Sequence, residues 1–386
     1  MLFRSRSALK IYCANPTKAY DIFSDPGMEG HVELRPMFLT SLVKDHQQMP
    51  HVHYVPQHLS QWVRNIKKEN RINVFWGSCS LPDKRGFTSL GPSVCYESEC
   101  LKAAELVILE VNPTLPFTAG STLVSVKDVD YFLENDHPIP SIPMKKIKPE
   151  TRKIAEWIAE LVTDGSTLQL GIGSIPNALG EVLLEKRDLG VHTEMINDVI
   201  FKLADAGVIT GSKKTLWPNK IIGSFAYGSQ DLYDFIDRNP YVELHPASIV
   251  NDPIRIGRNH RMTSINTAIE IDITGQVCSE SIGHVEISGI GGATDTHIGA
   301  QKSENGRGII ALESLTKENK SKIVSELRPG AKVSISRNDC DTVVTEYGIA
   351  EMQGKTVAER AKNLIAISHP SIREKLLHEA KEFGYL

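Results

Sequence analysis

The sequence predicts an α/β protein of two open domains, each with a mostly parallel sheet. Short runs rich in Val and Ile alternate with amphipathic stretches of helical period, which is typical of strand-helix-strand units. The 386 residues exceed the size of one ordinary core, so two domains are expected. Between them, the segment 134–150 carries four prolines in seventeen residues and predicts an extended connection. We therefore place the domains at 1–145 and 146–386.

The first domain is expected to begin with a strand at ALKIYC, residues 8–13. The twenty residues 1–20 hold four basic side chains and no acidic one, which weakly resembles a transit peptide, but the early strand favours a chain that enters its first domain directly and stays in the cytoplasm. RINVFWGSC (71–79) and ELVILEVN (105–112) have the composition of buried strands. The segment 81–93 between them is rich in turn residues and suits a ligand-binding loop.

The second domain is expected to begin with a helix from Pro149 to the Asp164-Gly165 pair. A strand at 166–173, a helix at 175–186 and a strand at 189–196 follow. Further strands are expected at these segments: KIIGSFAYG (220–228), AIEIDITGQV (268–277), GIIAL (308–312) and KVSIS (332–336). The charged tail 369–386 is predicted to be a helix with a solvated outer face.

Composition excludes several classes of partner. The net charge of −4 and the pI near 6.4 give no basic field for nucleic acid. No apolar run approaches the roughly 20 residues that a membrane span needs. The six cysteines are scattered without a CxxC pair, so we expect reduced thiols, no disulfides and no metal site.

Two glycine-rich segments are candidate binding loops. LQLGIGSIP (168–176) places Gly171 and Gly173 at a strand end before a helix, where free N–H groups attract negative charge. It matches half of a dinucleotide fingerprint, since Pro176 stands where GxGxxG needs glycine. A nicotinamide cofactor and a tight turn without any ligand are the alternatives there. The second segment, ISGIGGATD (287–295), permits close backbone approach to a ligand, or is a glycine bend with no ligand.

Glu194 in GVHTEMIND is a candidate catalytic carboxylate, because burying an acid among apolar residues at a strand end is costly without a function. Consecutive parallel strands are often neighbours, so Glu194 is expected beside the Gly171 to Gly173 turn. If both glycine loops reach one crevice, they offer two N–H donors to one oxygen, as an oxyanion hole does. An exposed or satisfied glutamate is the alternative.

Four other polar residues have simpler interpretations. His192, two residues before Glu194 and predicted on the same strand face, is interpreted as a packed or solvent-facing histidine. Asn197 and Asp198 are predicted to cap the following helix. Glu304 in QKSENGRG lies in a hydrophilic segment before a strand, whereas ligands in open α/β sheets bind beyond the carboxyl ends of strands. We interpret Glu304 as a charge in a solvated loop.

Taken together, these segments resemble the acetyl-CoA hydrolase/transferase family of CoA-transferases, most closely its 4-hydroxybutyrate CoA-transferase type. The resemblance covers most of the chain and is carried by these motifs: LPDKRGFTSLG, ILEVNPTLPFTAG, LGIGSIPNAL, GVHTEMIND, IEIDITGQVCSESIG, SGIGGATD, VVTEYGIAEMQGKT and ISHPSIREKL. Family members usually have more residues before the first strand and after HVEL (31–34), so no acyl-binding residue is carried over from the first domain. Ser-Glu-Asn-Gly is the catalytic signature of a related branch, the 3-oxoacid CoA-transferases, at a different place in the chain.

The resemblance implies a two-domain CoA-transferase fold with the active site in the inter-domain cleft. It implies Glu194 as nucleophile, with Ile172, Gly173, Gly291 and Gly292 as oxyanion and substrate-binding residues. Gly171 and Gly289 are then expected to bind CoA. The implied reaction moves CoA from a butyryl-, 4-hydroxybutyryl- or acetyl-CoA to a carboxylic acid such as acetate, by a ping-pong cycle through a glutamyl-CoA thioester.

Coenzyme A and acyl-CoA are substrates in this scheme, and no tightly bound cofactor is expected. A homodimer or a dimer of dimers is expected, with no nucleic acid or membrane partner. The alternatives are an acyl-CoA hydrolase, a non-catalytic acyl-CoA-binding protein and, more distantly, an NAD-dependent oxidoreductase that rests on GIGSIP alone.

Overall fold

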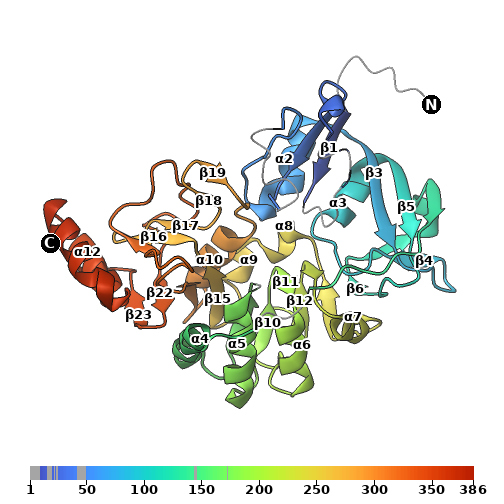
Figure 1. Ribbon diagram of the computed structural model, residues 1–386. Coiled ribbons are helices and arrows are strands. Elements are labelled where there is room, and N and C mark those ends of the chain that lie inside the picture. The colour runs from blue at the N-terminus through green and yellow to red at the C-terminus, as the bar shows by residue number, and fades with distance from the viewer. Residues whose placement is uncertain are drawn as a thin grey trace.

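A computed structural model describes residues 9–14, 20, 22, 25–40, 49–142, 146–171 and 173–386. Figure 1 shows a large sheet flanked by helices, a smaller region of N-terminal strands beside it, and the C-terminal helix on the side away from these strands. Nearly all the strand pairs of the main sheet are parallel. The predicted α/β class is therefore confirmed.

The main sheet has nine strands among the described residues, in the order β23-β22-β20-β15-β9-β10-β12-β14-β6. Only the β22–β23 pair is antiparallel within it. The strands span Ala119–Gly120 (β6), Thr167–Leu170 (β9), Gly190–His192 (β10), Ile221–Gly223 (β12), Val242–Leu244 (β14), Met262–Thr267 (β15), Arg307–Ala311 (β20), Thr342–Thr345 (β22) and Gly348–Glu351 (β23). Their side chains are buried on both faces in the centre, as expected for a parallel sheet between helices.

Helices α4, α5 and α6 lie in a row along one side of this sheet (Figure 1), and α10 packs on β15 and β20. Helix α4 begins at the predicted Pro149 but ends at Leu161, before the Asp164-Gly165 pair. The helices of this part span Pro149–Leu161 (α4), Ser174–Val182 (α5), Asp198–Asp205 (α6), Gln230–Ile236 (α7), Ala247–Val250 (α8), Pro253–Ile256 (α9) and Ala293–Lys302 (α10), with a 3₁₀ turn η5 at Leu183–Glu185.

Among its described residues, the N-terminal region contains three small sheets: β1-β2, β3-β5-β8 and β4-β7. Their strands are Leu9–Cys13 (β1), Val32–Pro36 (β2), Ile72–Cys79 (β3), Phe87–Ser89 (β4), Ala104–Val111 (β5), Leu123–Ser125 (β7) and Tyr131–Glu134 (β8). The helical segments are Pro26–Met28 (η1), Leu59–Gln61 (η3), Trp62–Glu69 (α2), Glu97–Ala103 (α3) and Val126–Asp128 (η4). The predicted strands near 71–79 and 105–112 are thus confirmed.

These two strands are nevertheless not buried on both faces. One face of β3 and β5 points into the core through Phe75, Val107 and Leu109, whereas on the other face Trp76 is 61% exposed. Side chains alternate between the two faces of a strand, so an apolar run does not by itself show that both faces are covered.

The two halves of the chain are more tightly joined than two separate cores would be. Strand β6, which precedes residue 145, pairs in parallel with β14 and becomes the edge of the main sheet. One hydrophobic cluster contains Phe75 and Leu109 from the first half together with Leu170 and Ile196 from the second. Residues 143–145 at the predicted boundary lie outside the described residues.

The C-terminal part forms a second core against helices α11 and α12. Its remaining elements are Glu270–Asp272 (β16), Val277–Cys278 (β17), Ser281–Ile282 (β18), Val285–Glu286 (β19), Ile323–Val324 (β21), Val357–Ala366 (α11) and Pro370–Glu382 (α12). The tail is helical, as predicted. The predicted strand at 332–336 is wrong, since Ile335 makes only an isolated bridge to Val277.

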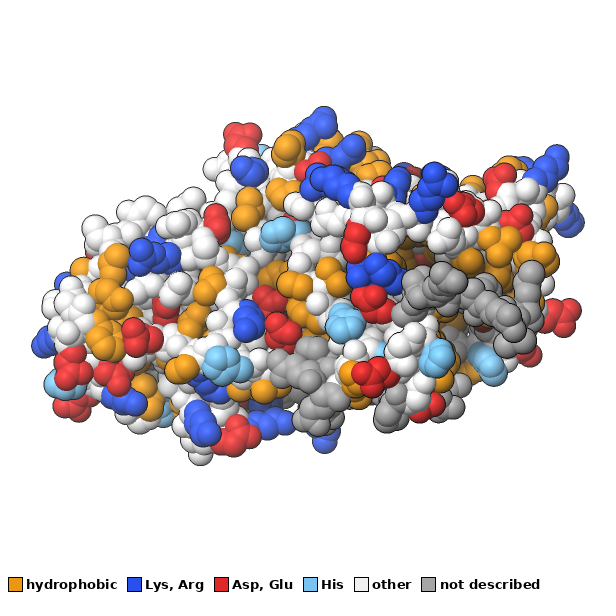
Figure 2. All heavy atoms as spheres, turned by 90° about the horizontal axis from the view of Figure 1, so that it is seen from above, with side chains coloured by type: hydrophobic (Ala, Val, Ile, Leu, Met, Phe, Trp, Pro, Cys, Tyr) orange, Lys and Arg blue, Asp and Glu red, His pale blue; other side chains and the backbone are white. Residues whose placement is uncertain are grey.

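Charged side chains of both signs are interspersed over the face shown in Figure 2. Among the helices that the structure describes, none is long and apolar enough to cross a membrane.

Candidate active site

Glu194 lies in a break between two short strands, two residues beyond the end of the first. Strand β10 ends at His192, and β11 (Met195–Ile196) pairs with β13 (Phe225–Ala226) in a separate two-stranded sheet. The backbone oxygen of Glu194 accepts hydrogen bonds from the N–H groups of Ser224 (2.9 Å) and Phe225 (3.2 Å). This places Glu194 beyond the carboxyl end of β10, where open α/β sheets bind ligands. The prediction of one continuous strand over 189–196 is therefore wrong.

Strand β10 lies beside β9, as the sequence predicted for consecutive strands of this unit. Strands β9 and β10 pair in parallel, with Leu168 opposite Val191. The loop that follows β9 is fixed from the Glu194 side, since Asn197 Nδ2 donates to the backbone oxygen of Gly171 at 2.9 Å. Asn197 also caps α6, as predicted, by accepting from two backbone N–H groups. Asp198 is not a cap of this helix, because its carboxylate accepts from Ser229 instead.

The Glu194 carboxylate is surrounded by groups from two other parts of the chain. Asn251 Nδ2, directly after α8, donates to Glu194 Oε2 at 3.0 Å. The backbone N–H of Gly292 lies close to the same carboxylate and favours its ionised form. Burial raises the pKa of Glu194 to about 7, and the charge of Asp295 adds to the rise, whereas the donors of Asn251 and Gly292 oppose it. The carboxylate therefore changes charge near neutral pH.

The glycine loop 289–292 comes close to Glu194 because it lacks side chains. A Cβ at Gly292 would overlap both Asn251 Nδ2 and Glu194 Oε2, and a Cβ at Gly291 would lie 3.6 Å from Glu194 Oε1. Gly291 also has a φ of +55°, in the region that favours glycine. On the other side of the loop, a Cβ at Gly289 would lie 2.6 Å from the backbone oxygen of Met37.

The first glycine loop is less completely described. Gly173 has a φ of +122° and precedes α5, with no atom within 4 Å of the position where its Cβ would stand. Ile172 lies outside the described residues. The Glu194 carboxylate accepts a hydrogen bond from Asn251, and the Gly292 N–H of the second loop lies close to it. A donor from the first loop stays a prediction.

His192 is a packed histidine, as interpreted from the sequence. Its Nε2 donates to the backbone oxygen of Val250 at 2.8 Å, and its Nδ1 accepts from Asn259 Nδ2 at 3.3 Å. A carbonyl oxygen can only accept, so this network sets the tautomer. Burial lowers the pKa of His192 to about 3, so the ring is neutral. Because Val250 directly precedes Asn251, His192 helps to hold the amide that contacts Glu194.

Asn251 and Asp295 are the residues that sequence reasoning missed. Asn251 follows an apolar stretch and precedes an Asp-Pro pair, a pattern that predicts only a turn. Asp295 lies in the ISGIGGATD segment. A carboxylate that follows three glycines of a candidate binding loop is the one feature of the sequence that could have indicated a role for it.

Glu304 occupies a different environment. Its side chain is 82% exposed in the loop after α10, and its carboxylate lies 3.7 Å from Nδ1 of His260. This geometry agrees with the solvated-loop interpretation.

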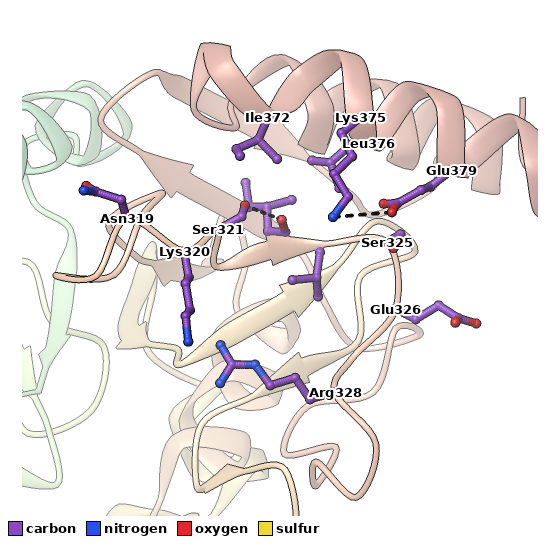
Figure 3. A pocket seen from close by; sticks show the side chains of 12 residues that line it. Asn319, Lys320, Ser321, Ser325, Glu326, Arg328, Ile372, Lys375, Leu376 and Glu379 are labelled. Atoms are coloured by element: carbon purple, nitrogen blue, oxygen red, sulfur yellow. Dashed lines mark hydrogen bonds and ion pairs between the residues drawn. The ribbon is translucent and has the colours of Figure 1, made fainter.

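A groove of about 620 Å³ lies elsewhere, between residues 319–328 and helix α12. Figure 3 shows Lys375 of α12 paired with Glu379, at 3.6 Å. It shares no residue with the surroundings of Glu194. We therefore place the candidate site at Glu194 and not in this groove.

Comparison with known proteins agrees with this choice of family. Residues 13–143 match the acetyl-CoA hydrolase/transferase N-terminal domain, and residues 228–380 match the C-terminal domain of the same name. The chain is 42% identical to a 4-hydroxybutyrate coenzyme A transferase of Clostridium kluyveri, over 93% of this chain and 84% of the relative. It is 36% identical to a butyryl-CoA:acetate CoA-transferase of Anaerostipes caccae, over 78% of this chain and 70% of the relative.

Two solved structures have the same fold. RipA from Yersinia pestis superposes with a TM-score of 0.91 at 31% identity, over 98% of this chain and 88% of RipA. A 4-hydroxybutyrate CoA-transferase from Porphyromonas gingivalis superposes with a TM-score of 0.81 at 31% identity, over 98% of this chain and 94% of that chain.

Proposed function

The chain belongs to the acetyl-CoA hydrolase/transferase family and is an acyl-CoA:carboxylate CoA-transferase, and from this premise we propose that it acts through a glutamyl-CoA thioester on Glu194. The observation that carries the proposal is the position of the Glu194 carboxylate between the Asn251 amide and the Gly292 N–H. A nicotinamide-dependent reaction has no support from these relatives.

In the proposed first half-reaction, the Glu194 carboxylate attacks the thioester carbonyl of the acyl-CoA. The C–S bond breaks, CoA leaves as thiolate, and a mixed anhydride forms. The thiolate then attacks the glutamyl carbonyl and expels the donor acid as its carboxylate, which leaves a glutamyl-CoA thioester. The acceptor carboxylate reverses these steps and regenerates free Glu194. Each half-reaction converts one thioester into another, so no ATP is consumed.

The surroundings of Glu194 suit both halves of this cycle. Partial burial removes water from the carboxylate and makes the ionised form more reactive, while a pKa near 7 keeps a large fraction ionised at neutral pH. When thiolate attacks the glutamyl carbonyl, negative charge develops on a carboxyl oxygen of Glu194. Asn251 Nδ2, at 3.0 Å from Oε2, and the Gly292 N–H are then donors to that charge.

The substrates we propose are a short acyl-CoA of the butyryl, 4-hydroxybutyryl or acetyl type and a small acid such as acetate. Relatives named for 4-hydroxybutyrate and for butyrate with acetate support this class. The alternative is hydrolysis, in which water takes the glutamyl thioester. We also propose a homo-oligomer in the cytoplasm and no tightly bound cofactor.

Mass spectrometry of the protein mixed with butyryl-CoA or acetyl-CoA, without acceptor acid, tests the mechanism. We expect a CoA adduct on the peptide that carries Glu194, lost on addition of acetate, formed also by Glu304→Ala and not by Glu194→Ala. An adduct that persists in Glu194→Ala would refute the proposal. Acyl-CoA consumption at equal rates with and without acetate would identify a hydrolase.

A further inference from the structure

A segment of the N-terminal region lies directly on the glycine loop that faces Glu194. The backbone N–H of Leu59 donates to the backbone oxygen of Gly291 at 3.2 Å. The next residue, Ser60, uses its N–H and its hydroxyl to bind the two carboxylate oxygens of Asp295, each at 3.1 Å. His58 Nδ1 lies 3.9 Å from the same carboxylate. Three successive residues therefore contact the segment 291–295.

The Leu59 contact acts on a peptide unit that also contains the donor to Glu194. The Gly291 carbonyl and the Gly292 N–H belong to one peptide bond, and the described residues contain no cis peptide. In a trans peptide these two groups point in opposite directions. When Leu59 holds the Gly291 oxygen on one side, the Gly292 N–H is directed to the other side, toward the Glu194 carboxylate. Glycine at both positions leaves this peptide otherwise free to rotate.

Asp295 anchors this arrangement. Its side chain is 4% exposed and lies in the first turn of α10, where the helix dipole favours a carboxylate. The groups that face it are Ser60 and His58 from the N-terminal segment, with the charges of Glu194 and Asp252 nearby. A second buried carboxylate beside a nucleophilic one is costly. The two hydrogen bonds from Ser60 offset that cost only while the N-terminal segment is docked.

We propose that Ser60 and Asp295 form a positioning pair across the two halves of the chain, which holds the Gly292 N–H on the reacting glutamate. Neither residue touches the reacting atoms, so both act through the 291–292 peptide. Asp295 has a second effect, since its charge disfavours the ionised form of Glu194. The inference deepens the proposed function of Glu194 and rests on it.

Single-turnover formation of the CoA adduct by the full chain, with butyryl-CoA, tests the pair. For Ser60→Ala and Asp295→Asn we expect adduct formation to slow by about 10- to 100-fold, because a misplaced oxyanion donor acts on the transition state, while KM for the acyl-CoA changes by less than about threefold. Ser60→Thr, which keeps a hydroxyl, is expected to regain most of the rate. Ser336→Ala is the matched control, because it removes a Ser–Asp hydrogen bond of 2.7 Å to Asp339 outside this site.

A pH profile separates positioning from a merely structural role. Asp295→Asn removes a negative charge near Glu194, so the acid limb of kcat/KM should move to lower pH, by roughly half a unit or more. Wild-type rates in both Ser60→Ala and Asp295→Asn would overturn the inference, as would an equal loss in Ser60→Thr. If Asp295→Asn does not fold, the comparison of Ser60→Ala with Ser60→Thr tests the inference by itself. An adduct in Glu194→Ala overturns the proposed function instead, and the inference with it.

Discussion

Glu194 and Glu304 stand in two regions of the same half of the chain and differ in almost every physical respect. Glu194 lies in a strand break at the carboxyl end of the main sheet, with an amide donor at 3.0 Å and a pKa raised to about 7 by burial. Glu304 lies in a loop after α10 with its side chain 82% exposed. The four residues around Glu304 match a catalytic signature, yet solvent surrounds it. Reactivity of a carboxylate follows from its environment rather than from a short sequence match.

The strongest test of this contrast is to remove each carboxylate in turn. Glu194→Ala should lose CoA transfer by at least about 10³-fold, because in the proposed mechanism the covalent thioester forms on Glu194. Glu304→Ala should keep wild-type activity. Steady-state transfer from butyryl-CoA to acetate measures both. Loss of activity in Glu304→Ala, with activity kept in Glu194→Ala, would show that Glu304 and not Glu194 is the reactive carboxylate.

A smaller loss of activity is expected when a residue beside the Glu194 carboxylate is changed and Glu194 itself is kept. In Gly292→Ala the new methyl group would overlap Asn251 Nδ2 and Glu194 Oε2, so the carboxylate must move away from its donors. We expect kcat to fall on the order of 10²-fold. Circular dichroism and the thermal midpoint check that the fold survives. A fully active Gly292→Ala would mean that this close approach has no part in the reaction.

The raised pKa of Glu194 predicts the pH dependence. In the proposed mechanism the ionised form is the nucleophile, so kcat/KM should fall about tenfold for each pH unit below about 7 and level off above it. An exposed carboxylate such as Glu304 should contribute nothing to this limb, and Glu304→Gln should show the wild-type profile. A limb near pH 4.5, the ordinary value for glutamate, would contradict the burial seen here.

The smallest expected effect is on stability. The folded-state pKa of Glu194 is raised from 4.5 to about 7, so between these values the folded state binds more protons than the unfolded state and stability falls as pH rises. Glu194→Gln removes this dependence and should stabilise the protein on the order of 3 kcal/mol at pH 8, and much less at pH 4. Thermal unfolding at the two pH values measures the difference, with Glu304→Gln as the neutral control.

Local pattern was sufficient to predict much of the fold. The runs 71–79 and 105–112 became β3 and β5, and Pro149 began α4, because apolar periodicity and helix-start chemistry act over a few residues. The pairing of β9 with β10 followed from their place as consecutive strands of one strand-helix-strand unit. Glu194 could be singled out for a similar reason, as an acid within an apolar strand pattern.

The local sequence pattern did not predict the strand boundaries where one segment pairs with strands of two different sheets. Residues 189–196 have the composition of one strand, yet β10 pairs within the main sheet and β11 pairs with β13. The two N–H groups of Ser224 and Phe225 on the Glu194 oxygen fix the break between them. Likewise, 332–336 has strand composition, but only Ile335 reaches a partner.

The sequence by itself determined the class of fold, the order of its elements and the carboxylate most in need of an explanation. Only the tertiary structure decided what surrounds that carboxylate. Asn251 lies 57 residues after Glu194 in the chain, and Ser60 lies 134 residues before it. Hydrogen bonds between such residues depend on how sheets, loops and helices pack, and no local periodicity encodes that packing.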